Sequence, residues 1–193
     1  MKDDGITLGK MIKKVIGSYL AIDFMLLFIN LPFSALMISN VYDESKNIVA
    51  VESRLLPCIL IGSFTLLIYF ALTLGYMGPV GEKLRSPFNE TPIDKYLAIK
   101  ASAIVFALPF AAGVFTALTG AGVIPIGQSF YNNTMRFVYN LFYGPVYGFL
   151  MAFYYRSWLT PIFPPLIMVC VIEITYWIVL KGFKLPRIFY RQK

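Results

Sequence analysis

Four long apolar stretches divide the chain, and they contain almost no charged residues. Residues 55–81 and 101–135 hold no Asp, Glu, Lys or Arg, whereas residues 15–42 and 160–180 hold one acid each, Asp23 and Glu173. A helix needs about 20 mostly apolar residues to cross a hydrocarbon layer ~30 Å thick. The pattern therefore predicts an all-α integral membrane protein, with spanning helices at about residues 15–39, 55–79, 101–124 and 161–180.

The composition of a fifth apolar segment, residues 137–155, is compatible with a position at the membrane surface or with one inside the membrane. Nine of its 19 residues are Phe or Tyr, and aromatic rings concentrate at the depth of the lipid headgroups. It also carries a small residue at every fourth position, at Gly144, Gly148 and Ala152, a pattern that lets membrane helices approach closely. We therefore expect a polytopic bundle of four transmembrane helices plus an aromatic-rich helix that is either interfacial or a fifth span.

The distribution of basic residues favours four spans over five. With four spans, 13 of the 17 Lys and Arg residues lie on the side that holds both termini, whereas five spans divide them nine against eight. Positive residues accumulate on the cytoplasmic side of membranes, so we predict four spans with a cytoplasmic N-terminus. This arrangement places residues 137–155 at the outer surface. The connections are too short to fold as separate domains, so residues 1–193 are expected to form a single membrane domain.

Polar side chains inside the predicted spans are the candidate functional groups, because it is costly to bury them in lipid. When depth is counted from the flanking lysines of a four-span protein, Asp23 and Glu173 lie at matching depth, roughly 12–14 Å into the layer. A shared proton, a bound cation or a charged substrate group would stabilise the two acids. Alternatively, the polar groups only form hydrogen bonds between helices or face a partner subunit. The predicted intramembrane polar site comprises Asp23, Asn30, Tyr69, Thr73, Tyr76 and Glu173.

Several classes of chemistry lack the residues that they require. The chain contains no histidine, which excludes His-dependent triads and His-ligated metal or haem. Its two cysteines, Cys58 and Cys170, lie in different predicted spans without metal-ligand spacing. We therefore predict no catalytic residue, no metal site and no cofactor, and we do not expect an enzyme. The net charge of +7 comes mainly from bases at the ends of spans, where they meet headgroups, so no nucleic-acid partner is expected.

These patterns favour a multi-pass protein of a plasma membrane, of the bacterial cytoplasmic type, whose partners are the lipid bilayer and other membrane protein subunits. Short loops and helix faces of small residues, such as Ala103, Ala107 and Ala111, favour a non-enzymatic subunit or accessory factor of a larger membrane assembly. One alternative is a component of small-solute or ion-coupled transport with a polar pocket on the cytoplasmic side. Another is an immunity or envelope-stress protein, in which residues 137–155 meet a toxin or lipid at the outer face.

Overall fold

The computed structural model describes residues 6–42, 48–86, 92–125, 142–154 and 159–182. Four helices in this part of the chain, one of them with its preceding 3₁₀ turn, are long and apolar enough to cross a membrane, as the hydrophobic pattern predicts. Their bounds are Leu8–Met37 for α1, Leu55–Leu84 for α2, Leu97–Gly120 for α3 and Phe163–Leu180 for α6, which follows the 3₁₀ turn η2 at Thr160–Ile162.

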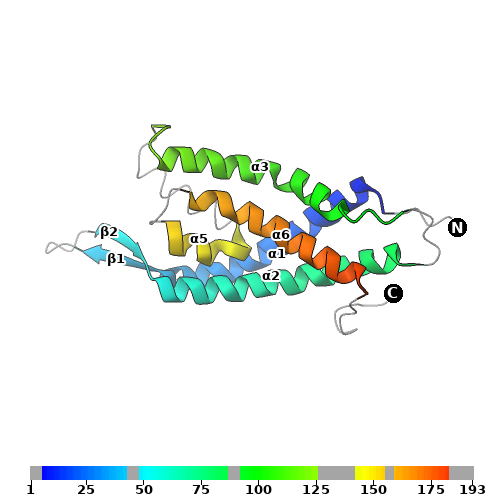
Figure 1. Ribbon diagram of the computed structural model, residues 1–193. Coiled ribbons are helices and arrows are strands. Elements are labelled where there is room, and N and C mark those ends of the chain that lie inside the picture. The colour runs from blue at the N-terminus through cyan, green and yellow to red at the C-terminus, as the bar shows by residue number, and fades with distance from the viewer. Residues whose placement is uncertain (1–5, 43–47, 87–91, 126–141, 155–158, 183–193) are drawn as a thin grey trace.

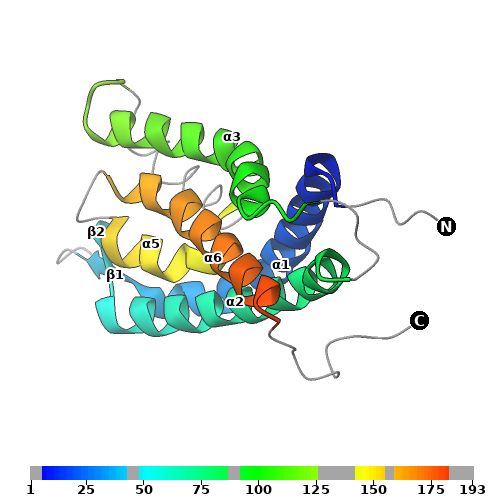
Figure 2. The same cartoon turned by 45° about the vertical axis from the view of Figure 1, so that its right-hand side comes forward.

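The four helices form one bundle in which the chain runs alternately up and down (Figure 1). Helices α2 and α3 each pack against both α1 and α6. The start of α1 and the end of α6 lie at the same end of the bundle (Figures 1 and 2), as an even number of crossings requires. We call this the basic end, because eight of the nine Lys and Arg residues in the described segments belong to it, namely Lys10, Lys13, Lys14, Lys83, Arg85, Lys95, Lys100 and Lys181.

Several helix boundaries differ from the prediction, and α3 both begins and ends four residues before the predicted range 101–124. Helix α1 begins at Leu8 rather than near residue 15. Helix α2 continues through Pro79 to Leu84, so the predicted end of the second span at residue 79 is wrong. Proline is tolerated inside membrane helices when neighbouring groups satisfy the freed backbone. Gly81, in this additional part of α2, serves close packing, because a Cβ added there would lie 2.8 Å from the Cβ of Val179 on α6.

A β-hairpin joins α1 to α2 at the end of the bundle that we call the hairpin end. Strand β1 (Ile38–Tyr42) follows α1 without a break and pairs antiparallel with β2 (Ile48–Ser53). The Arg54 N–H donates to the Met37 carbonyl oxygen at 2.8 Å, which closes the base of the hairpin. The all-α prediction is therefore correct for the four long apolar helices but incomplete at the connection between α1 and α2.

A short helix lies inside the hairpin end of the bundle, where the sequence suggests an interfacial helix or a fifth span. It consists of the 3₁₀ turn η1 (Gly144–Val146) and α5 (Tyr147–Tyr154). Residues 144–154, which we call the half-helix, measure about 16 Å at 1.5 Å per residue, roughly half of a hydrocarbon layer. Residues 143–148 and 150–152 are buried. The described part of this segment is therefore neither a span nor a surface helix; residues 137–141 and 155 lie outside the described residues.

The half-helix begins in the middle of the bundle and ends at the hairpin end (Figure 1). Its first residue, Gly144, contacts Asp23 near the midpoint of α1. Near its other end, the Ala152 carbonyl oxygen lies 3.5 Å from the Ser53 hydroxyl of β2. It packs mainly on α2, and a Cβ added at Gly148 would lie only 2.4 Å from the backbone nitrogen of Gly62. This contact confirms the close helix approach that the spacing of small residues predicts.

Candidate intramembrane polar site

Asp23 binds the backbone at the start of the half-helix. The Gly144 N–H donates to Asp23 Oδ1 at 2.9 Å, and only 4% of the Asp23 surface is exposed. The first N–H groups of a helix have no partner within the helix, and its N-terminus carries a partial positive charge. A carboxylate from α1 therefore both satisfies a free donor and complements the helix dipole at mid-depth.

Two further side chains of α1 bind the same stretch of backbone. Asn30 Nδ2 donates to the Gly144 carbonyl oxygen at 2.8 Å, and the Tyr19 hydroxyl donates to the Phe142 carbonyl oxygen at 2.6 Å. Asn30 is fully buried and Tyr19 is nearly so. One polar face of α1 thus holds the point at which the chain becomes helical.

Helix α2 and the half-helix itself satisfy the remaining backbone groups at this point. The Thr65 hydroxyl lies 3.1 Å from the Pro145 carbonyl oxygen, and Pro145 has no N–H to satisfy. The Val146 N–H donates to the carbonyl oxygen of Tyr143 at 3.0 Å, and the Tyr147 N–H donates to that of Gly144. Irregular backbone is tolerated at membrane depth only where protein or a water-filled cavity satisfies it, and these contacts meet that condition.

Three polar atoms beside this junction are buried without a hydrogen-bond partner in the described residues: Asn30 Oδ1, the Tyr69 hydroxyl and Thr73 Oγ1. Tyr69 is 1% exposed, and its hydroxyl interacts with the Thr73 hydroxyl and, electrostatically, with the Asp23 carboxylate. Thr73 lies one turn further along α2 and is equally buried. Each unsatisfied polar group costs several kcal/mol in an apolar medium. These atoms therefore provide unused capacity for a water molecule or a polar ligand.

The structure thus brings together four of the six predicted site residues, Asp23, Asn30, Tyr69 and Thr73. We call these four, with Tyr19 and Thr65, the central polar cluster. It lies near the middle of the bundle, because Asp23 occupies the midpoint of the 30-residue helix α1.

The other two predicted site residues lie apart from this cluster. Tyr76 is 38% exposed, and the Lys14 ammonium lies 5.6 Å from the centre of its ring. Glu173 Oε1 accepts a hydrogen bond from Trp177 Nε1 on its own helix at 2.8 Å. Within the described residues, no hydrogen bond or ion pair joins Glu173 to Asp23.

Glu173 lies closer to the basic end than Asp23 does. The Tyr176 hydroxyl, one turn beyond Glu173, donates to the Asp94 carbonyl oxygen at 2.8 Å, and Asp94 precedes the start of α3 at the basic end. The two acids therefore do not share a site in this structure, although their depths counted from the flanking lysines match.

Tyr19 and Thr65 are polar residues of the site that the predicted set does not include. Tyr19 lies four residues before Asp23, and Thr65 lies four residues before Tyr69. Residues four apart share a helix face, so this spacing is the signal that identifies both.

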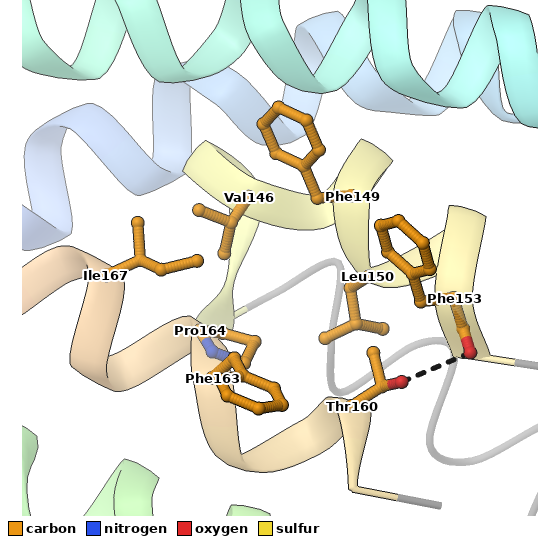
Figure 3. A pocket seen from close by; sticks show the side chains of 8 residues that line it. All are labelled: Val146, Phe149, Leu150, Phe153, Thr160, Phe163, Pro164 and Ile167. Atoms are coloured by element: carbon orange, nitrogen blue, oxygen red, sulfur yellow. Dashed lines mark hydrogen bonds between the residues drawn. The ribbon is translucent and has the colours of Figure 1, made fainter. Parts of the chain in front are cut away.

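A separate cavity of about 410 Å³ lies between α5 and the start of α6 (Figure 3). Its lining is apolar except for Thr160, whose hydroxyl donates to the Phe153 carbonyl oxygen at 3.1 Å. No free polar group is therefore available to orient a solute there, and we do not assign it to the polar site. Its lining residues are Val146, Phe149, Leu150, Phe153, Thr160, Phe163, Pro164 and Ile167.

Comparisons of the chain with protein-family models, with curated proteins and with solved structures find no match. A function for this protein therefore has to follow from the geometry of the central polar cluster.

Proposed function

We propose that this chain is a non-enzymatic membrane component that transports a cation, or a solute with a cationic group, and that Asp23 binds the cargo at mid-depth. One observation carries the proposal: the half-helix begins in the middle of the bundle against a buried carboxylate that has no ion-pair partner in the described segments. Transporters commonly form their binding sites near the bilayer midplane from discontinuous helices. An ionisable residue at such a depth is a functional-site hypothesis by default.

The unsatisfied polar atoms support the same proposal. Asn30 Oδ1 belongs to a side chain that binds Gly144, as Asp23 does, the Tyr69 hydroxyl interacts with Asp23, and Thr73 lies one turn beyond Tyr69 on α2. They offer additional oxygen ligands to a cargo or to the water that accompanies it. Tyr69 and Thr73 extend from Asp23 toward the basic end, so they also outline a polar route to that side.

The test is a flux measurement on the purified full-length protein in liposomes. Proton flux is followed with an internal pH-sensitive dye under an imposed pH gradient, and sodium flux is followed with ²²Na⁺. We expect flux of at least one ion above that of protein-free vesicles, and its loss in Asp23→Asn. Asparagine keeps an oxygen acceptor for the Gly144 N–H, so the half-helix stays in place. Ser34→Ala is the control, because the exposed Ser34 hydroxyl only binds the Leu31 carbonyl oxygen of its own helix. Equal flux in Asp23→Asn and the control contradicts the proposal.

We also propose that the basic end faces the cytoplasm of a plasma membrane. Eight basic residues of the described segments lie there, and Arg54 lies at the hairpin end, in the direction that the positive-inside rule expects. With Cys58 and Cys170 replaced by serine, a cysteine at Lys181 should react with a maleimide only from the cytoplasm, and one at Arg54 only from outside. Reaction of both from the same side contradicts the even number of crossings, and reversed sides contradict the orientation.

A second proposed function, a subunit of a larger membrane assembly, is supported by the outer surface of α3. Ala103, Ala107 and Ala111 lie one turn apart and are all exposed, whereas Gly113 packs within the bundle against Pro161. Exposed small residues at this spacing suit close packing against another membrane helix.

The test of this second function is the size of the complex in native membranes. Ala107→Leu should shift the protein to a smaller species on native electrophoresis, whereas Leu108→Ala should not, because the 79% exposed Leu108 lies outside the series. An unchanged complex in Ala107→Leu contradicts the assembly role.

The immunity or envelope-stress alternative loses the observation that motivated it. It requires residues 137–155 to face outward, but most of the described part of this segment is buried in the bundle. We therefore do not propose it as a function.

A further inference from the structure

A groove on the outer surface of α1 leads to the central polar cluster. It has a volume of about 520 Å³ and is lined by Leu20, Ala21, Asp23, Phe24 and Phe142. Leu20, Phe24 and Phe142 are 55%, 62% and 43% exposed. Because the groove lies at the middle of a spanning helix, the medium outside it is the hydrocarbon of the bilayer.

Asp23 is the polar residue among those that line this groove, and one of its two carboxylate oxygens has no partner in the described residues. Oδ1 accepts the Gly144 N–H, whereas Oδ2 forms no hydrogen bond and no ion pair in the described part of the chain. Asp23 is 96% buried by the surrounding side chains, yet it contributes to the groove wall. An ionised carboxylate without a partner beside an apolar groove is costly, and either a bound proton or a positive ligand removes that cost.

We propose that the groove binds a lipophilic monovalent cation, such as a quaternary phosphonium or a protonated amine on a large apolar body, which enters sideways from the bilayer. The charge of this ligand pairs with Asp23, and its body lies against Leu20, Phe24 and Phe142. The faces of aromatic rings also attract cations. This inference names the cargo class for the proposed transport site and therefore rests on the proposed function.

The lining distinguishes this ligand from a small hydrated cation. Sodium or calcium needs about six oxygen ligands to replace its water, but the groove wall offers the carboxylate of a single residue among four apolar ones. A lipophilic cation carries little bound water, so one carboxylate and apolar walls suffice for it. A neutral apolar molecule fits the walls but leaves Asp23 unpaired.

The experiment measures the binding of tetraphenylphosphonium to the full-length protein in detergent micelles by equilibrium dialysis. We expect saturable binding by the unmodified protein and at least a tenfold weaker affinity in Asp23→Asn. The neutral analogue triphenylphosphine oxide should not compete. Ala21→Trp fills the groove without touching the carboxylate and should also weaken binding, whereas Ala35→Trp, at an exposed position of α1 outside the groove, should not.

Each outcome has one meaning. Unchanged affinity in Asp23→Asn, effective competition by the neutral analogue, or unchanged affinity in Ala21→Trp overturns the inference. Should Asp23→Asn fail to fold, the comparison of Ala21→Trp with Ala35→Trp still decides the location of the site. Tetraphenylphosphonium binding without any protein-dependent tetraphenylphosphonium flux into liposomes supports the site and contradicts transport of this cargo. Asp23-dependent proton or sodium flux without tetraphenylphosphonium binding supports transport and contradicts this cargo class.

Discussion

The contact between the half-helix and α2 makes Gly148→Ala a decisive perturbation of this fold. A Cβ at Gly148 would lie 2.4 Å from the Gly62 nitrogen and 2.6 Å from the Cys58 carbonyl oxygen. An ordinary contact begins at 3.4 Å, so the half-helix has to move away from α2 by about 1 Å. The opposing atoms are backbone atoms of a continuous helix, which cannot rotate aside as a side chain can.

The cost follows from the size of this displacement. Extra methyl groups in a well-packed core typically cost about 1–3 kcal/mol. A gap of 0.5–1 Å also forfeits roughly a quarter to a half of the dispersion energy at the contacts that open. The movement stretches the hydrogen bond of 2.9 Å between Gly144 and Asp23 as well. We therefore expect Gly148→Ala to lower the free energy of unfolding by about 2–3 kcal/mol, at the upper part of the range for overpacking.

The assay is unfolding of the purified protein in mixed micelles by increasing SDS, followed by circular dichroism. Gly62→Ala tests the same contact from α2, since its Cβ would lie 2.8 Å from the Phe149 nitrogen, and it should also destabilise. Gly75→Ala is the matched control on α2, because a Cβ there meets no atom within 4 Å. The control should be neutral or stabilising by up to about 1 kcal/mol, because alanine favours helix. If Gly148→Ala unfolds at the same SDS concentration as Gly75→Ala, the proposed position of the half-helix is refuted.

Two further predictions concern single polar contacts. Asn30→Leu should destabilise the bundle by up to about 1.7 kcal/mol, the upper range for hydrogen bonds between membrane helices. Ser34→Ala should be neutral in the same SDS titration. Equal unfolding midpoints of the two variants contradict the role of Asn30. The hydrogen bond of 2.7 Å from Lys100, together with one from the Tyr96 N–H, lowers the pKa of Asp94. The stability that this pair adds is therefore fully present above the pKa of Asp94 in the unfolded chain, and it is lost as the pH falls through the lower pKa of Asp94 in the folded protein. Lys100→Met should raise the pKa of Asp94 toward its usual value in an NMR titration, and an unmoved pKa contradicts the ion pair.

Sequence patterns predict the spanning helices well, because the length of an apolar run is the physical requirement for crossing a bilayer. The last span illustrates this, since the prediction of residues 161–180 differs from η2 and α6 only at the first residue. The end of the second span was missed, because Gly78 and Pro79 have the composition of a turn. In the structure, tertiary packing outweighs this local signal, and α2 continues for five residues beyond Pro79.

The hairpin and the half-helix were harder to predict for different reasons. β-Branched residues on both sides of a polar stretch, such as Val41, Ile48, Val49 and Val51, are a strand signal that the hydropathy of the flanking spans conceals. The half-helix has the aromatic content of an interfacial segment, and hydropathy alone cannot distinguish a segment at the surface of a bundle from one in its interior. Its small residues at every fourth position were the correct indication, because they imply contact with another helix.

The sequence predicts the polar side chains of the candidate site but not the backbone groups that they bind. Polar residues at membrane depth identify Asp23 and Asn30, but their partners are the backbone N–H and carbonyl groups of Gly144, and every residue except proline has both groups. No sequence pattern distinguishes them. Pairing Asp23 with Glu173 relied on depth counted from lysines, and this count fails because α1 continues beyond Lys14 to Leu8.

The polar face of α1 explains how this bundle holds a helix that starts in its interior. The start of any helix exposes unpaired backbone groups, and inside a membrane each of them requires a protein partner. Tyr19, Asp23 and Asn30 supply one acceptor and two donors to residues 142–144. An asparagine at position 23 would also accept the Gly144 N–H, so the backbone alone does not require a negative charge there. An ionisable carboxyl at position 23, with only Oδ1 bound in the described residues and with an open groove beside it, is the choice of residue that the fold leaves unexplained and that a cationic ligand accounts for.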